Sequence, residues 1–296
     1  MIRLRKIMAP VDFSESSKKA DNYALSLALQ FDARLILAHV VPYDAGAYEQ
    51  AKADLLALIP PDCRERINFE IIVKSGDVRG ELIGIIEDKE IDLAVMGTRG
   101  RSYFERMFLG SVTDRLLRKL HVPILTVSHL DPEREIHPPA PVSLQRILYA
   151  TDLADGSKEG LEFAIRFARG LDAALTVAHV VRVGDVYSGI ETAVVPADYP
   201  TDIRGQAEEA LDRMVALTSD GSVPIGTVVA EGVPHEIINR LAGQYRADLI
   251  VLNLQNKGLL ERAVLGATAE RVIRTASIPV LSLPMPAIYG SRWEAA

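Results

Sequence analysis

The chain contains an internal repeat, and this feature constrains the fold more than any other. The segment KIMAPVDFSESSKKA, which begins at Lys6, returns as RILYATDLADGSKEG at Arg146, an offset of 140 residues. Farther along, Asp92 returns as Asp248 at an offset of 156, so the second copy carries 16 additional residues, which we expect within 182–205. Solenoid repeats are only about 20–50 residues long. Two copies of this greater length therefore indicate two similar domains.

The repeat divides the 296 residues into four parts. We expect a first domain at 1–128, a linker at 129–144, a second domain at 145–285 and a C-terminal tail at 286–296. The linker contains four prolines, Pro132, Pro138, Pro139 and Pro141. A stretch so rich in proline is extended and fairly stiff.

Each copy alternates apolar runs with segments of helical periodicity. The runs of the first copy, which we expect to be strands, are residues 7–11, 34–41, 69–73, 92–96 and 122–127. Ser14 is placed to cap the first helix, and Pro60 with Pro61 ends the second. Apolar strands separated by helices indicate a parallel sheet that is covered on both faces. The fold class is therefore α/β, with two doubly wound domains of five parallel strands each.

Right-handed crossovers favour a doubly wound sandwich, and we expect the strand order 3-2-1-4-5 in each domain. Ligands of such sheets bind beyond the carboxyl ends of the strands, at the point where the order reverses. Here that point lies between strands one and four. Asp12 follows the first strand and Gly97 follows the fourth, so we expect both residues at the ligand site.

The segment at 97–111 carries the clearest binding signal. It reads glycine, two residues, glycine, nine residues, and then Gly110 and Ser111 at the start of a helix. Gly97 and Gly100 let backbone amides turn toward an anion. The helix that begins at Ser111 presents unpaired N–H groups and a positive dipole end, which favour phosphate.

Two arginines of this segment, Arg99 and Arg101, add positive charge. The alternative interpretation is a plain glycine loop before a capped helix. The position of the segment at the end of strand four, opposite Asp12, favours a phosphate site.

With these blocks in place, the chain resembles a tandem member of the universal stress protein family. The resemblance rests on residues 11–14, on His39 and Val40, on the glycine pattern at 97–111 and on residues 122–127. It covers almost everything outside the linker and the tail. The ATP-binding members of the family keep the glycine pattern, so the resemblance implies ATP, with Mg2+ bound through the phosphates.

The resemblance also implies which residues hold the nucleotide. Those expected at adenine and ribose are Asp12, Val40 and Met96. Those expected at ribose and phosphates are Gly97, Gly100, Arg101, Gly110, Ser111 and Val112. The family pairs its domains through the fifth strand, which implies an intrachain pseudo-dimer with residues 124–127 against 280–283. The apolar character of both segments agrees with this, because bare apolar edges are normally covered or paired.

The second copy departs from the glycine pattern. Asn253, Asn256 and Ala267 stand where the first copy has Gly97, Gly100 and Ser111. Asparagine tolerates left-handed backbone, so the turn is compatible with these changes. We nevertheless expect the asparagine side chains to crowd the phosphate path and the second site to be degenerate. The alternative is a different ligand in that pocket.

Other candidate residues have simpler interpretations. His39 and His179 are repeat mates, and we expect strand-end residues bonded to backbone and not metal ligands, since no HExxH pattern is present. Asp12 and Asp152 favour a binding or turn role over acid catalysis, because no second carboxylate or nucleophile is comparably placed. Cys63 is the one cysteine, which excludes an intrachain disulfide. We therefore predict no catalytic residue and no protein metal site.

Several function classes are disfavoured. The chain has no G-x-G, Gly-Lys or G-x-S-x-G motif, which disfavours a dinucleotide fingerprint, a P-loop and a hydrolase elbow. The net charge of −7 argues against nucleic acid and anionic membranes as partners. No apolar run reaches the roughly 18–20 residues of a membrane span, and the N-terminus lacks the apolar core of a signal peptide. We expect a cytoplasmic protein.

The sequence thus predicts an ATP-binding stress-response regulator or sensor, with the nucleotide in the first domain. The alternatives are a slow ATPase or phosphotransferase that uses the same pocket, and a nucleotide-free interaction protein with vestigial pockets. Its protein partners are unknown, and a homodimer of whole chains stays open.

Overall fold

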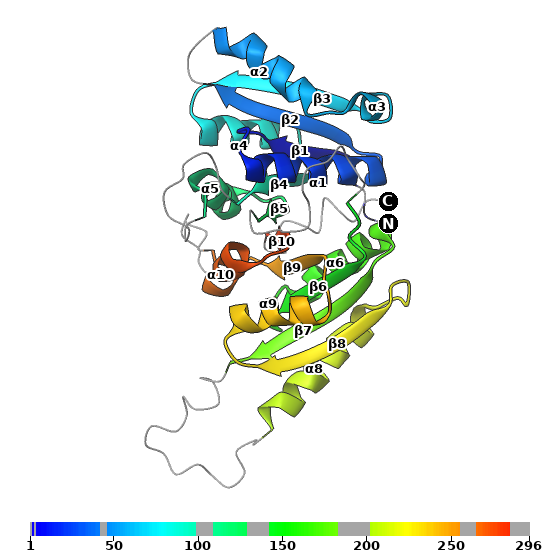
Figure 1. Ribbon diagram of the computed structural model, residues 1–296. Coiled ribbons are helices and arrows are strands. Elements are labelled where there is room, and N and C mark those ends of the chain that lie inside the picture. Colours follow the sequence, from blue (N-terminus) through cyan, green and yellow to red (C-terminus); the bar gives the residue numbers. More distant parts are fainter. Residues whose placement is uncertain are drawn as a thin grey trace, which may run out of the picture.

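The computed structural model describes residues 2, 4–41, 46–98, 109–128, 142–182, 202–254 and 265–284. Within these residues, ten strands form one continuous sheet in the order β3-β2-β1-β4-β5-β10-β9-β6-β7-β8 (Figure 1). The elements of the first half are β1 (Lys6–Pro10), α1 (Glu15–Phe31), β2 (Arg34–Val41), α2 (Gly46–Ala57), α3 (Pro61–Arg64), β3 (Phe69–Ser75), α4 (Val78–Asp88), β4 (Leu93–Gly97), α5 (Ser111–Lys119) and β5 (Ile124–Val127).

The second half repeats this order. Its elements are β6 (Arg146–Thr151), α6 (Ser157–Leu171), β7 (Ala174–Val181), α8 (Ile203–Thr218), β8 (Ile225–Glu231), α9 (Pro234–Gln244), β9 (Leu249–Asn253), α10 (Ala267–Thr275) and β10 (Val280–Leu283). Every strand pair inside a half is parallel. The predicted α/β class and the strand order 3-2-1-4-5 are confirmed in both halves.

The two halves meet through their fifth strands, β5 and β10, which lie at the centre of the molecule (Figure 1). These strands pair in antiparallel orientation, with Leu125 opposite Leu281. Neither leucine is accessible to solvent. The hydroxyl of Thr126 donates to the carbonyl oxygen of Val280 at 3.1 Å. The predicted intrachain pseudo-dimer is therefore confirmed, and both apolar edges are covered.

Helices cover both faces of the sheet. One hydrophobic core lies under α1, α2, α6 and α8, and the other lies under α4, α5, α9 and α10. The first core runs across the join between the halves, where Phe31 at the end of α1 stacks on Phe167 of α6 with ring centroids 5.7 Å apart. Side-chain packing as well as strand pairing thus holds the halves together.

Local sequence explains the helix ends near the switch point. Ser14 caps α1 as predicted, because its Oγ accepts a hydrogen bond from the backbone N–H of Ser17 at 3.2 Å. Asp77 caps α4, accepting from the N–H of Gly80 at 2.8 Å. Asp32 and Asp172, which are repeat mates, close α1 and α6 in left-handed conformation with φ of 51° and 52°. The two halves therefore use the same local devices.

The proline pair ends the second helix as expected, but the structure adds a short helix after it. The helix before it, α2, ends at Ala57, but the second proline also begins a short helix, α3. Proline is favoured at the first helical position because its missing N–H would be unpaired there anyway. Most of the predicted linker and of the extra segment of the second copy, and the whole of the predicted tail, lie outside the described residues.

Candidate functional site

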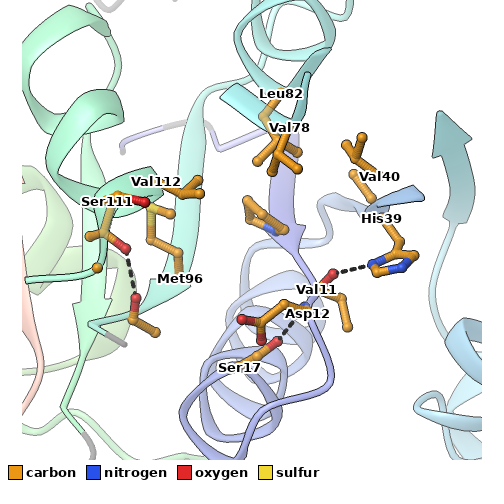
Figure 2. Close-up of a pocket in the computed structure, with 15 residues that line it drawn as sticks. Val11, Asp12, Ser17, His39, Val40, Val78, Leu82, Met96, Ser111 and Val112 are labelled. Atoms are coloured by element: carbon orange, nitrogen blue, oxygen red, sulfur yellow. Dashed lines mark hydrogen bonds between the residues drawn. The ribbon is translucent and has the colours of Figure 1, made fainter. Parts of the chain in front are cut away.

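A cavity of about 350 Å³ opens at the carboxyl ends of β1, β2 and β4, where the strand order reverses (Figure 2). Its lining residues are Pro10, Val11, Asp12, Ser17, Ala38, His39, Val40, Val78, Leu82, Met96, Gly97, Gly110, Ser111, Val112 and Thr113. Cavities that hold small molecules range over roughly 300–1,000 Å³. The cavity is therefore large enough for a small-molecule ligand and lies where the fold places one.

The structure brings most of the predicted site residues together. The predicted residues that line the cavity are Asp12, Val40, Met96, Gly97, Gly110, Ser111 and Val112. Gly100 and Arg101 lie outside the described residues. The sequence analysis did not assign eight further lining residues to the site: Pro10, Val11, Ser17, Ala38, His39, Val78, Leu82 and Thr113. Each lies at the end of a predicted strand or in the first two turns of the helix that follows one, so its position in the chain could have indicated it.

One part of the cavity is apolar. Val40 of β2 and Met96 of β4 contribute from the sheet, and Val78, Leu82 and Val112 contribute from the first turns of α4 and α5 (Figure 2). Val78 is 39% exposed, so this apolar surface reaches the mouth of the cavity. Such a slot suits a flat, weakly polar group such as a heterocyclic ring.

The other part of the cavity is formed by the N-terminus of α5. The N–H of Gly110 is used, since it donates to the carbonyl oxygen of Thr98 at 2.9 Å. The N–H groups of Ser111, Val112 and Thr113 have no acceptor within the helix, because they belong to its first turn. All three residues line the cavity. This end therefore offers backbone donors and the positive end of a helix dipole to an anion.

A threonine hydroxyl fixes this helix terminus on the sheet. Thr113 is buried, and its Oγ1 donates to the carbonyl oxygen of Gly97 at 2.9 Å. Ala269 is the repeat mate of Thr113 and has no hydroxyl. The first turn of α5 is thus tied to the end of β4 by a contact that the corresponding residue of α10 cannot make.

Asp12 shapes the turn between β1 and α1. Its N–H donates to the Oγ of Ser17 at 3.2 Å (Figure 2). Its Oδ1 accepts from the N–H of Ser14 at 3.0 Å. The predicted turn role is therefore observed. Asp12 also lines the cavity.

The two paired histidines hold backbone at strand ends. The Nδ1 of His39 donates to the carbonyl oxygen of Val11 at 2.6 Å, and that of His179 donates to Thr151 at 2.9 Å. The interpretation of both as residues bonded to backbone is confirmed. In each half this contact ties the second strand to the turn that follows the first.

The structure requires glycine at position 97 for a different physical reason from the one predicted. A Cβ at this position would lie 2.6 Å from the Oγ and 2.8 Å from the carbonyl carbon of Ser16. The φ of Gly97 is outside the left-handed region. The glycine is required because the first turn of α1 packs directly on the end of β4. Any role in turning amides toward an anion comes second to this close contact.

In the second copy the side chain at this contact comes from the strand, and the glycines come from the helix. Asn253 replaces Gly97, and the residues that face it across the helix contact are Gly156 and Gly160, the mates of Ser16 and Ala20. The Nδ2 of Asn253 donates to the carbonyl oxygen of Gly156 at 2.9 Å. The side-chain bulk has moved from the helix to the strand, so the packing is kept.

Tyr149, the mate of Ala9, completes this buried cluster. Its hydroxyl donates to the carbonyl oxygen of Ser157 at 2.8 Å and lies 3.2 Å from the Nδ2 of Asn253. Burial raises the pKa of Tyr149, so the phenol stays neutral. The Asn253 amide is thus directed into the contact between β9 and α6, which corrects the expectation that it crowds a phosphate path. Asn256 lies outside the described residues.

Over the described ranges, no helix has both the length and the apolar character needed to cross a membrane. The same part of the chain contains no cluster of three or more His, Cys, Asp or Glu side chains suited to a metal ion.

Comparisons with known proteins agree with the fold. A universal stress protein from Archaeoglobus fulgidus superposes with a TM-score of 0.69 at 22% identity, over 95% of this chain and 99% of that one. Universal stress protein MJ0531 of Methanocaldococcus jannaschii is 33% identical over 147 residues, which is 48% of this chain and 83% of the relative. Universal stress protein E homolog of Haemophilus influenzae is 26% identical over 213 residues, 67% of this chain and 63% of the relative.

The universal stress protein family model matches the chain twice, at residues 3–128 and at 143–284. The two matches correspond to the two halves of the sheet and to the two copies of the internal repeat. The chain is therefore a member of the universal stress protein family that carries two tandem copies of its domain.

Proposed function

We propose that the first domain binds an adenine nucleotide, with ATP as the expected ligand, and that the chain acts as a nucleotide-dependent regulator or sensor of stress. The observation that carries this proposal is the convergence of two surfaces on one cavity. The apolar slot suits the base, and the free first turn of α5 suits the phosphates. Asp12 lines the same cavity, and we assign its carboxylate to the ribose.

Different lining residues would contact different parts of the nucleotide. Val40, Met96 and Val112 would contact adenine, and the carboxylate of Asp12 would accept hydrogen bonds from ribose hydroxyls. The N–H groups of the first turn of α5 and the hydroxyl of Ser111 would donate to phosphate oxygens. Mg2+ would be held through the phosphates, and Gly100 and Arg101 would extend the phosphate site. A sensor that binds and releases nucleotide needs these contacts and no protein nucleophile.

The first test is the nucleotide content of the purified chain. The protein is denatured, and the extract is chromatographed for adenine and guanine nucleotides. Calorimetry with ATP, ADP, cAMP and GTP then ranks the ligands in the presence of Mg2+; cAMP is included because one universal stress protein has been solved in complex with it. We expect one ATP per chain, since Ala267 replaces the Ser111 hydroxyl in the second copy. A stoichiometry near two would contradict the degenerate second site.

The second test is a matched pair of substitutions. Gly110→Asp places a carboxylate at the N-terminus of α5, and repulsion should weaken ATP binding at least roughly tenfold, about 1.4 kcal/mol. Gly266→Asp, the same change at the start of α10, is the control and should leave the affinity unchanged. Equal affinities for wild type and a folded Gly110→Asp variant would refute the phosphate assignment.

A further inference from the structure

Helix α1 carries a carboxyl group inside the core of the first domain. The side chain of Asp21 is buried, and among the described residues neither of its carboxylate oxygens has a hydrogen-bond partner. An unpaired buried charge is very costly, so such a group is held neutral or expelled. Its repeat mate Leu161 is fully buried in α6. The site is therefore one that an apolar side chain fills in the other domain.

The charges around Asp21 favour its neutral form. Burial raises the pKa of Asp21 well above its ordinary value, the charge of Asp12 raises it further, and Lys18 on the same helix lowers it. The neighbouring strands β4 and β5 have no ionisable side chain. The ionisable residues on the other elements that pack against α1 are Lys6 on β1, Arg34 and His39 on β2, and Lys158, Glu159, Glu162, Arg166 and Arg169 on α6.

Asp21 is linked to the cavity through the first turns of its own helix. Ser17 lies four residues earlier, one turn along α1, and is buried at the edge of the cavity. The Oγ of Ser17 accepts the N–H of Asp12 at 3.2 Å. The packing of α1 on the sheet therefore holds the Asp12 turn in position. A movement of the helix away from the sheet would displace this side of the cavity.

We propose that Asp21 is a proton-operated switch of the first domain. When its carboxyl group is neutral, α1 packs on the sheet and holds the Asp12 turn in place. When the carboxyl group is ionised, the first half of α1 leaves the core. As a consequence, the first domain becomes less stable as the pH rises. This device goes beyond nucleotide binding and does not require it.

The sign of the pH dependence follows from linkage. An aspartate in the unfolded chain titrates at about pH 4. The folded-state pKa is raised, so the stabilisation is complete below that pH and is lost as the pH rises toward the folded pKa. In that window one proton is bound in the folded state and not in the unfolded state. The folding equilibrium constant therefore falls by up to about tenfold per pH unit.

The protonation state is measured directly by NMR of the full chain labelled with 13C at aspartate carboxyl groups. The Asp21 resonance is identified by its loss in Asp21→Leu, the substitution that copies Leu161. We expect the chemical shift of a neutral carboxylic acid at pH values above about 4, where an aspartate of the unfolded chain is ionised. An Asp21 that ionises together with ordinary aspartates would overturn the proposal.

The energetic effect is measured by urea unfolding between pH 5 and pH 9 without added nucleotide. Asp21→Leu should be more stable than wild type, and the ratio of their folding constants should grow by up to about tenfold per pH unit. Asp21→Asn also removes the titrating group and serves if the leucine variant is misfolded. Asp88→Asn, an exposed carboxylate on α4, is the control and should run parallel to wild type. Parallel curves for wild type and both Asp21 variants would overturn the switch.

The movement itself is measured by amide hydrogen exchange in α1, corrected for the intrinsic pH dependence. Exchange should accelerate from pH 6 to pH 9 in wild type and not in Asp21→Leu. Equal protection of α1 in both proteins at pH 9 would show that ionisation does not unseat the helix. Because no nucleotide is present, these results stand apart from the calorimetric test of ATP binding.

Discussion

At the scale of single residues, the most informative contact is that between the first turn of the first helix of each half and the end of its fourth strand. In the first half Gly97 makes room for Ser16, and in the second Gly160, the mate of Ala20, makes room for Asn253. Each pair contains one glycine and one side chain. The departure of the second copy from the glycine pattern is therefore an exchange of bulk across one contact, and not simple decay.

We predict that Gly97→Ala destabilises the chain by about 1–3 kcal/mol, the usual cost of overpacking a close contact. The new Cβ would meet the Ser16 side chain and also its backbone carbon at 2.8 Å. Adding Ser16→Gly removes the side-chain part of the clash and should recover part of the loss. Urea unfolding of the four proteins gives the coupling energy. Additive effects of the two changes would show that the residues do not share this contact.

The spacing of the glycines was sufficient to single out Gly97, but not to explain it. The pattern predicts a loop that turns amides toward an anion, whereas the contact that forbids a side chain comes from a distant segment of the chain. Asp21 shows the same limit. An aspartate among helical polar residues normally faces solvent, and only the tertiary packing of α1 reveals that it is buried.

At the scale of elements, α5 is the helix on which the candidate site depends. Its first turn supplies the free N–H groups, and Thr113 sets the distance of that turn from β4. The pattern of apolar runs predicted the strands and their order, because buried parallel strands are nearly continuous in apolar residues. It missed α3, since a proline pair was interpreted only as a stop.

We expect Thr113→Val to lower stability by about 1 kcal/mol, because the carbonyl of Gly97 loses its hydrogen-bond donor. The same change should weaken ATP binding, since the first turn of α5 is no longer held against β4. Thr113→Ser restores the hydroxyl and should return both quantities toward wild type. Calorimetry beside urea unfolding checks this. Wild-type affinity in the valine variant would show that the tie does not position the phosphate end.

At the scale of the whole molecule, the central pairing of β5 with β10 makes one sheet from two domains. Helix α5 contacts α10 across this join, where Arg118 lies 3.6 Å from Glu270. Both charged side chains are partly exposed, so this ion pair adds little stability. The paired apolar strands and the stacked rings of Phe31 and Phe167 contribute buried apolar contact to the join.

We predict that Leu125→Lys combined with Leu281→Lys separates or destabilises the halves. The two residues are direct partners without solvent exposure, so the substitution buries two like charges side by side. A cost of several kcal/mol corresponds to a fall in Tm of about 5–10 °C in a chain of this size. Leu217→Lys, at a position that is 74% exposed, is the control. The pairing would be unimportant if X-ray scattering and thermal melts found the double variant as compact and stable as the parent.

The central strand pair has a further consequence for how the two copies can change over time. An interface between identical chains must be self-complementary, because every residue is present on both sides. Here the register still follows that rule, with Thr126 facing Val280 and Ser282 facing Ile124. The contacts no longer do: the Thr126 hydroxyl is bonded to Val280, whereas its mate, the buried Ser282 hydroxyl, has no partner among the described residues. Because the two copies are joined in one chain, their interface does not have to be twofold symmetric, and a substitution on one side leaves the other side unchanged. The two copies are nevertheless always present in a ratio of one to one.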